Sequence, residues 1–132
     1  MFTQIKTSGE NRDVVKDLSR KFNLGAENMI ARIALSYSLS LGKKLSLNDI
    51  KDSKGKEYSK NVLFGPYLIF YVGLVCVHYD LYKTDKDIPK YIKMHIDDGL
   101  QIMNEELKSN PNLNGYAYLI DKINVGLSDI KI

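Results

Sequence analysis

The side chains that could do catalytic chemistry are few and poorly spaced for it. Cys76 and His78 stand two positions apart, so on a helix they point to different sides and cannot form a nucleophile–base pair. His95 flanks an apolar stripe, which is typical of a satisfied histidine at the edge of a core, and no H-x-x-x-H or H-E-x-x-H metal spacing occurs. Asp97 and Asp98 are adjacent and diverge on a helix, and neither Gly-Lys pair has the flanking residues of a Walker A loop. We therefore expect a protein that is not an enzyme and needs no cofactor or metal.

Positive charge is concentrated toward the N-terminal end of the chain. Residues 1–61 hold 12 of the 19 Lys and Arg residues but 7 of the 16 Asp and Glu residues, so the remainder is slightly acidic. A basic half joined to a neutral or acidic half is typical of a nucleic-acid or anionic-surface partner, although solubility alone also produces it. The imbalance makes a nucleic acid one candidate partner, and solubility remains the alternative.

The spacing of these cations suggests where DNA would bind. A helix over residues 9–22 would align Arg12, Lys16 and Arg20 along one side, and the turn chemistry of residues 52–56 leaves lysine ends exposed. Two aspartates lie within i+3 or i+4 reach of the helical cations, so a solvated surface with ion pairs remains an alternative. The candidate DNA-binding residues are Lys6, Arg12, Lys16, Arg20, Lys43, Lys44, Lys54 and Lys56.

The length and periodicity predict one mainly α-helical domain over residues 1–132. The expected parts are a strand–helix–helix unit over 2–41 with helices at 9–22 and 26–41, a basic exposed loop over 42–61, and a helical core over 66–127 with an amphipathic helix from 88 to 107 and a last helix from 116. One cysteine excludes a disulfide within the chain, and the polar N-terminus lacks the apolar region of a signal peptide. We expect a cytoplasmic protein.

The segment Asn61–Tyr79 contains no Asp, Glu, Lys or Arg. Its apolar run, residues 67–77, is about half the length of roughly 20 residues that a membrane span needs. Pro66 suits the first turn of a helix. We interpret the segment as a buried helix at the centre of the core, and expect no membrane association.

The second predicted helix is apolar on two sides, because Leu35 and Leu39 lie away from the face that carries Ile30 and Ala34. A helix of this kind is usually buried twice. The second face, with Leu35 and Leu39, is a candidate oligomer interface. Burial by later helices of the same chain is the alternative.

Several ordered blocks of this sequence are characteristic, namely Ile5–Asn11, Asn23–Ala34, Asp52–Tyr58, Val62–Gly65, Tyr82–Pro89 and His95–Asp97. These blocks resemble the DndE family of DNA sulfur modification proteins. The resemblance extends to about Leu100, and the tail after Asn110 is less diagnostic.

This resemblance implies a subunit of the bacterial phosphorothioation machinery, in which sulfur replaces a non-bridging phosphate oxygen of DNA. It implies a fold similar to ribbon–helix–helix proteins at the N-terminus, a homo-oligomer such as a tetramer, binding of nicked duplex DNA through surface lysines, and partner proteins that supply sulfur and ATP-dependent chemistry. The family's glycine-containing turn maps onto Leu24-Gly25-Ala26, which makes Gly25 an oligomer-interface candidate.

The resulting hypothesis is a homo-oligomer that binds the backbone of duplex DNA with little sequence preference. One rival is a non-catalytic scaffold that assembles the modification complex and contacts DNA only indirectly. A nicking enzyme is a third reading, and the missing catalytic cluster argues against it.

Overall fold

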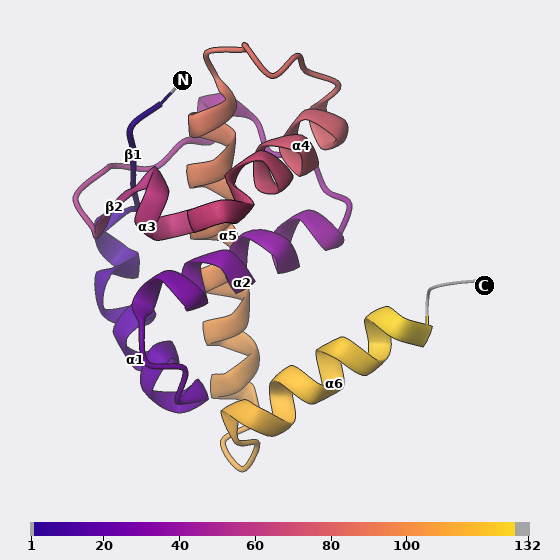
Figure 1. The fold of residues 1–132 in the computed structure, drawn as a ribbon. Helices are drawn as coiled ribbons and strands as arrows, with labels where there is room; N and C mark the ends of the chain where they lie inside the picture. Colours follow the sequence, from indigo (N-terminus) through magenta and orange to yellow (C-terminus); the bar gives the residue numbers. More distant parts are fainter. Residues whose placement is uncertain (1, 129–132) are drawn as a thin grey trace.

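The computed structural model describes residues 2–128 and shows a mainly helical protein built around one long helix, α5 (Figure 1). The mainly α class is confirmed, as is the strand–helix–helix order at the N-terminus. In chain order the elements are β1 (Gln4–Lys6), η1 (Gly9–Asn11), α1 (Arg12–Phe22), α2 (Glu27–Ser40), η2 (Leu47–Asp49), β2 (Glu57–Ser59), α3 (Lys60–Phe64), η3 (Gly65–Tyr67), α4 (Leu68–Tyr79), α5 (Ile88–Ser109) and α6 (Gly115–Ser128).

Helix α5 is central because its apolar residues repeat at helical spacing. Ile92, Ile96 and Leu100 are at most 1% exposed and face the other helices. Helix α2 crosses α5 so closely that a Cβ added to Gly99 would lie 2.0 Å from the backbone oxygen of Ala34. A glycine at this crossing therefore allows the two helices to meet.

Both apolar sides of α2 are buried within the same chain. Helix α2 packs on α5 and also contacts α1, α3 and α4. Leu35 is fully buried, so its assignment to an oligomer interface is wrong, because later helices of the same chain cover it. Leu39 is half-buried against the core. Gly25 is exposed in the turn between α1 and α2 with φ +83°, a conformation that favours glycine.

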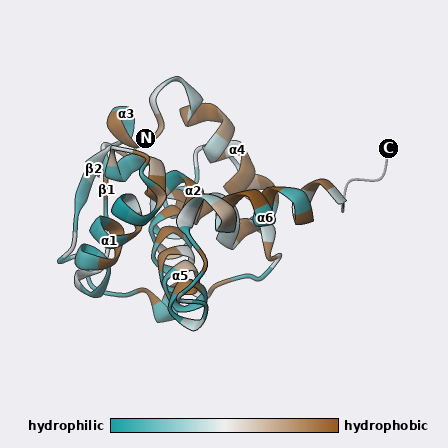
Figure 2. Cartoon of the chain, turned by 90° about the horizontal axis from the view of Figure 1, so that it is seen from below, coloured by the Kyte–Doolittle hydropathy of each residue, from teal (hydrophilic) through white to brown (hydrophobic). Residues whose placement is uncertain are grey.

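Helix α4 is not the central, covered helix that its composition predicts. Only Val72 and Val75 are buried, whereas Ile69 is 82% and Val77 85% exposed. Figure 2 shows this apolar helix at the edge of the molecule. An apolar sequence with no polar side does not indicate which face is buried, and α5 already fills the centre.

The stretch Lys60–Tyr79 is long and apolar enough to cross a membrane by length and composition, with a mean hydropathy of 1.7 and 22% of it buried. The helix is interrupted at Gly65, whose φ is +54°. Helix α4 alone has 12 residues, or about 18 Å of length, against a hydrocarbon core of about 30 Å. The exposed apolar residues of α4 lie on the outer surface of the fold.

The predicted basic loop over 42–61 is more ordered than expected. Strand β2 pairs antiparallel with β1, and Ile5 lies opposite Tyr58, both of them buried. The strand β1 is thus paired inside its own chain. This pairing brings Lys54 and its neighbours in the loop next to α1, where Arg12 contacts the Lys54 and Gly55 backbone.

Candidate nucleic-acid interface

A buried polar cluster fixes the N-terminal turn on α5. The Asp97 carboxylate accepts hydrogen bonds from the Ser8 backbone N–H at 3.0 Å and from the Asn11 amide at 2.8 Å. Lys93 Nζ lies 2.9 Å from the other Asp97 oxygen and also donates to the backbone oxygen of Asp52 at 2.7 Å. The side chains of Lys93 and Asp97 are 8% and 3% exposed. Together they connect α5, the turn before α1 and the loop that carries Lys54.

The loop 52–55 is held against the same turn by backbone contacts. The Asp52 carboxylate accepts from the N–H groups of Gly9 and Lys54, each at 2.9 Å, and these bonds lower the pKa of Asp52. The Gly55 N–H donates to the Thr7 oxygen, and a Cβ on Gly55 would lie 2.2 Å from the Ser8 oxygen. The loop therefore presents Lys54 from a defined backbone.

Arg12 positions this loop with its side chain. Its Nη2 donates to the backbone oxygens of Lys54 at 3.1 Å and Gly55 at 3.0 Å. Lys16 lies one turn further along the same face of α1. Lys16 and Lys54 are exposed, and neither side chain forms a hydrogen bond or ion pair with any residue between 2 and 128. These two ammonium groups are thus available to an anionic ligand.

Three further candidates surround this pair but have acidic partners. Lys6 lies 3.8 Å from Glu57, Lys56 lies 3.6 Å from Glu27, and Arg20 pairs with Asp17. The Arg20 side chain is 79% exposed, so solvent screens its pair strongly. We call these six residues the N-terminal cation cluster: Lys6, Arg12, Lys16, Arg20, Lys54 and Lys56.

Lys43 and Lys44 lie apart from this cluster. Lys56 pairs with the first residue of α2, whereas Lys43 and Lys44 follow its last turn, and the 14 residues of α2 are about 21 Å long. Lys43 forms a 2.9 Å ion pair with Asp98 on α5. The predicted cations therefore form two groups in one subunit and not one patch.

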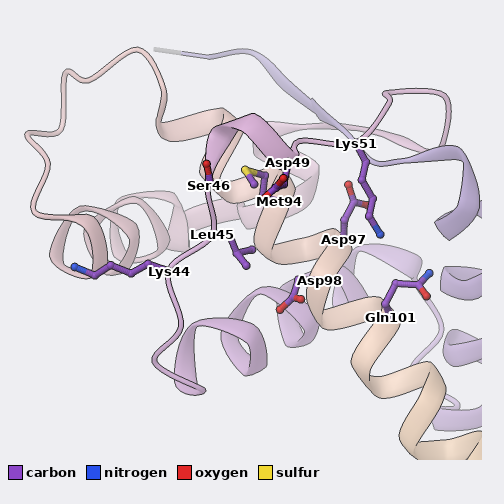
Figure 3. Close-up of a pocket in the computed structure, with 9 residues that line it drawn as sticks. All are labelled: Lys44, Leu45, Ser46, Asp49, Lys51, Met94, Asp97, Asp98 and Gln101. Atoms are coloured by element: carbon purple, nitrogen blue, oxygen red, sulfur yellow. The ribbon is translucent and has the colours of Figure 1, made fainter.

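A polar pocket of about 340 Å³ lies between Lys44–Lys51 and α5 (Figure 3). Two of its three carboxylates are already engaged, Asp97 by the buried cluster and Asp98 by Lys43. No group of three or more potential metal ligands occurs in the part of the chain that the structure describes.

A serine–histidine pair, which the sequence analysis did not foresee, lies behind the pocket. Ser38 Oγ is 2.7 Å from His95 Nδ1, and the Tyr79 hydroxyl is 2.6 Å from His95 Nε2. Burial, with a smaller effect of His78, lowers the pKa of His95 to about 4. Ser38 and His95 are fully buried and both ring nitrogens are engaged, so the pair holds α2, α4 and α5 together.

The sequence reasoning also missed Lys93 as a positioning residue. Its i, i+4 spacing from Asp97 was the available signal, because that spacing allows an ion pair on one helix. Asn11 carried no comparable signal, since its partner Asp97 on α5 is 86 residues away.

Comparison with known proteins gives one family match. The family model described as "DNA sulphur modification protein DndE" matches residues 4–111. Among solved structures, DndE from Escherichia coli B7A, involved in DNA phosphorothioation modification, is 19% identical with a TM-score of 0.63, and a glycine-to-lysine mutant of DndE is 21% identical with a TM-score of 0.65. Each alignment covers 78% of this chain and 98% of the other. These two structures show the same fold. No curated protein matches.

Proposed function

Because this chain belongs to the DndE family of DNA sulphur modification proteins, we propose that it is the DNA-binding subunit of a phosphorothioation system. It contacts the backbone of duplex DNA with little sequence preference and leaves the chemistry to other phosphorothioation proteins. The proposal also makes it a subunit that is not itself an enzyme and that acts in the cytoplasm.

The observation that carries the proposal is the arrangement of Lys16 and Lys54. Arg12 fixes the Lys54 backbone beside α1, one turn from Lys16, and neither lysine is paired with an acid within the described residues. Lysine ammonium groups bind phosphate as point charges, which requires no base contact. Arg20 exchanges its weak, exposed pair for a phosphate at little cost.

Oligomerisation is part of the proposal. One subunit separates its cations into two groups, so copies of the chain would join the N-terminal cation cluster of one subunit to the cations of the next. Several weak contacts on one assembly multiply the affinity without new contacts. An interrupted strand bends more easily across such a surface, which gives a preference for nicked duplex.

Retardation of labelled duplex in a gel, with and without a single nick, tests the proposal. The wild type should retard both duplexes, the nicked one at lower protein concentration, and added salt should weaken binding steeply. Charge reversal at Lys43 and Lys44 should weaken retardation and reduce modification in cells. The proposal is wrong if neither duplex is retarded at low salt.

The alternative is a scaffold subunit that contacts DNA only indirectly. The observation in its favour is that Lys6, Arg20, Lys43 and Lys56 all pair with carboxylates of the same chain. Under this alternative, charge reversal at Lys43 and Lys44 leaves modification in cells unchanged.

A further inference from the structure

Helix α6 (Gly115–Ser128) is attached to the rest of the described protein through residues 115–122. Gly115 packs so closely on α1 that an added Cβ would lie 2.3 Å from the Lys21 oxygen. Tyr118 stacks on Phe22 with a ring separation of 5.7 Å, and Lys122 pairs with Glu106 at 2.9 Å. These contacts fix the direction in which α6 leaves the body.

Beyond Lys122 the helix has no cover. Every residue from 123 to 128 is exposed, and Figure 1 shows this end of α6 projecting away from the other helices. Tyr116, Ile120, Ile123 and Leu127 recur at spacings of three and four, so they share one face, apart from the face that carries Tyr118 and Lys122. An uncovered amphipathic helix of this length is marginal in water, so this apolar face needs a partner.

The same chain has an apolar groove without an occupant. The groove has a volume of about 910 Å³ and runs between α4 and the segment Lys83–Pro89. Apolar side chains and one glycine line much of it, namely Phe2, Ile69, Val72, Gly73, Cys76 and Ile88. The exposed lysines Lys83 and Lys86 stand at its rim, together with Asp85. A Cβ added to Gly73 would meet nothing within 4 Å, so there is open space above this residue.

We propose that α6 of one subunit docks in the α4 groove of a second copy of this chain. The groove lies at the first turn of α5, whereas α6 follows its last turn, and the 22 residues of α5 are about 33 Å long. An α6 anchored at Tyr118 and Lys122 therefore cannot fill the groove of its own chain. A second copy supplies both surfaces, and reciprocal exchange closes a symmetric pair.

The groove rim carries Lys83, Asp85 and Lys86, a small net positive charge, whereas residues 123–128 of α6 carry no charged side chain. Docking therefore covers the apolar face of α6 without burying a charge of its own. Helix α6 also lies outside residues 4–111, so this contact is separate from what the family match covers. The inference rests on the oligomer part of the proposed function and not on DNA binding.

Sedimentation of three full-length variants tests this contact. Ile123→Lys places a charge on the apolar face of α6 and should raise the dissociation constant of self-association at least tenfold. Asn124→Lys is the matched control, since it adds the same charge to a neighbouring exposed position about 100° around the helix, and it should change this constant less than twofold. Gly73→Leu fills the groove and improves helix propensity, so weaker association with an unchanged urea midpoint assigns the loss to the groove and not to unfolding.

A cross-link between copies gives the second measurement. Cys76 is the only cysteine and lines the groove, so wild-type protein is mixed with a Cys76→Ser/Ile123→Cys variant and treated with a short bismaleimide. We expect a cross-linked heterodimer, and much less of it when position 124 carries the new cysteine. A wild type that stays monomeric at high concentration would overturn the inference, as would one whose self-association is unchanged in Ile123→Lys and Gly73→Leu.

The same measurements also test two other possible partners of these surfaces, a lipid membrane and another phosphorothioation protein. Monomeric protein that binds vesicles of neutral lipid through Ile123, or that associates only with another phosphorothioation protein, contradicts the inference. Salt-sensitive DNA retardation by a monomer would leave the proposed function standing while this contact falls. Self-association that depends on Ile123, without any retardation, would give the reverse result.

Discussion

The substitution Asp97→Asn should destabilise the protein strongly, because it leaves the buried Lys93 ammonium without its carboxylate partner. The substituted side-chain amide keeps an oxygen for the Ser8 N–H and the Asn11 side chain, but presents an N–H group to Lys93. The Lys93 ammonium is then left with the Asp52 oxygen as its remaining partner. Breaking a buried ion pair by removing one member costs about 3 to 5 kcal/mol, a large part of the roughly 5 to 15 kcal/mol that stabilises a domain.

Urea unfolding at neutral pH measures this loss. With a slope of about 2 kcal/mol per M, the midpoint should fall by about 2 M. The double variant Lys93→Met/Asp97→Asn removes the stranded ammonium, so it should be more stable than Asp97→Asn alone, with a coupling above about 1 kcal/mol. A loss below about 1 kcal/mol in Asp97→Asn, or strictly additive losses in the double variant, would refute the account of this cluster.

Three further predictions concern stability. His95 has a pKa of about 4 in the folded protein and about 6.5 in the unfolded chain, so folding favours its neutral form. The contribution of His95 to the free energy of unfolding is therefore complete above pH 6.5 and is lost as the pH falls toward 4, by up to about 3 kcal/mol. Urea midpoints measured from pH 7 to pH 5 should fall for the wild type and fall less for His95→Gln. Gly99→Ala should destabilise the protein by more than about 2 kcal/mol, since its Cβ would strike the Ala34 oxygen, whereas the matched Gly73→Ala should be neutral or stabilising by up to about 1 kcal/mol in the same assay. Tyr58→Phe should keep or slightly raise the thermal midpoint, because the Tyr58 hydroxyl is buried and finds no hydrogen-bond partner among the described residues.

The sequence predicts α5 well because its physics is local. Its apolar residues recur with helical period from Ile88 to Leu107, and this face is the one that is buried. The first two helices were likewise predicted to within about one turn at their starts.

Helix α4 shows where such reasoning ends. A segment that is apolar on all sides has no periodicity that separates a buried face from an exposed one. Its position therefore depends on which of the apolar helices packs at the centre of the fold. Strand β2 was missed because three residues form it, and its partner β1 lies more than 50 residues away. Both features depend on long-range packing.

The candidate site was predictable in residue type but not in pairing. Charge counts locate the cations in the first half of the chain, yet Lys56–Glu27 and Lys43–Asp98 join residues that are distant in sequence. Lys16 and Lys54 lack such partners within residues 2–128, as do Lys21 and Lys44, and what distinguishes the pair is that Arg12 holds the Lys54 backbone beside α1, one turn from Lys16.

The salt dependence of duplex binding by Lys16→Gln/Lys54→Gln tests the central claim most directly. Each phosphate contact contributes about 0.9 to the slope of log affinity against log salt, so the double variant should bind more weakly with a slope shallower by about 1.8. Lys108→Gln, an exposed change at the last turn of α5, should keep the wild-type slope. An unchanged slope in the Lys16→Gln/Lys54→Gln variant would contradict the claim that these two lysines bind the DNA backbone.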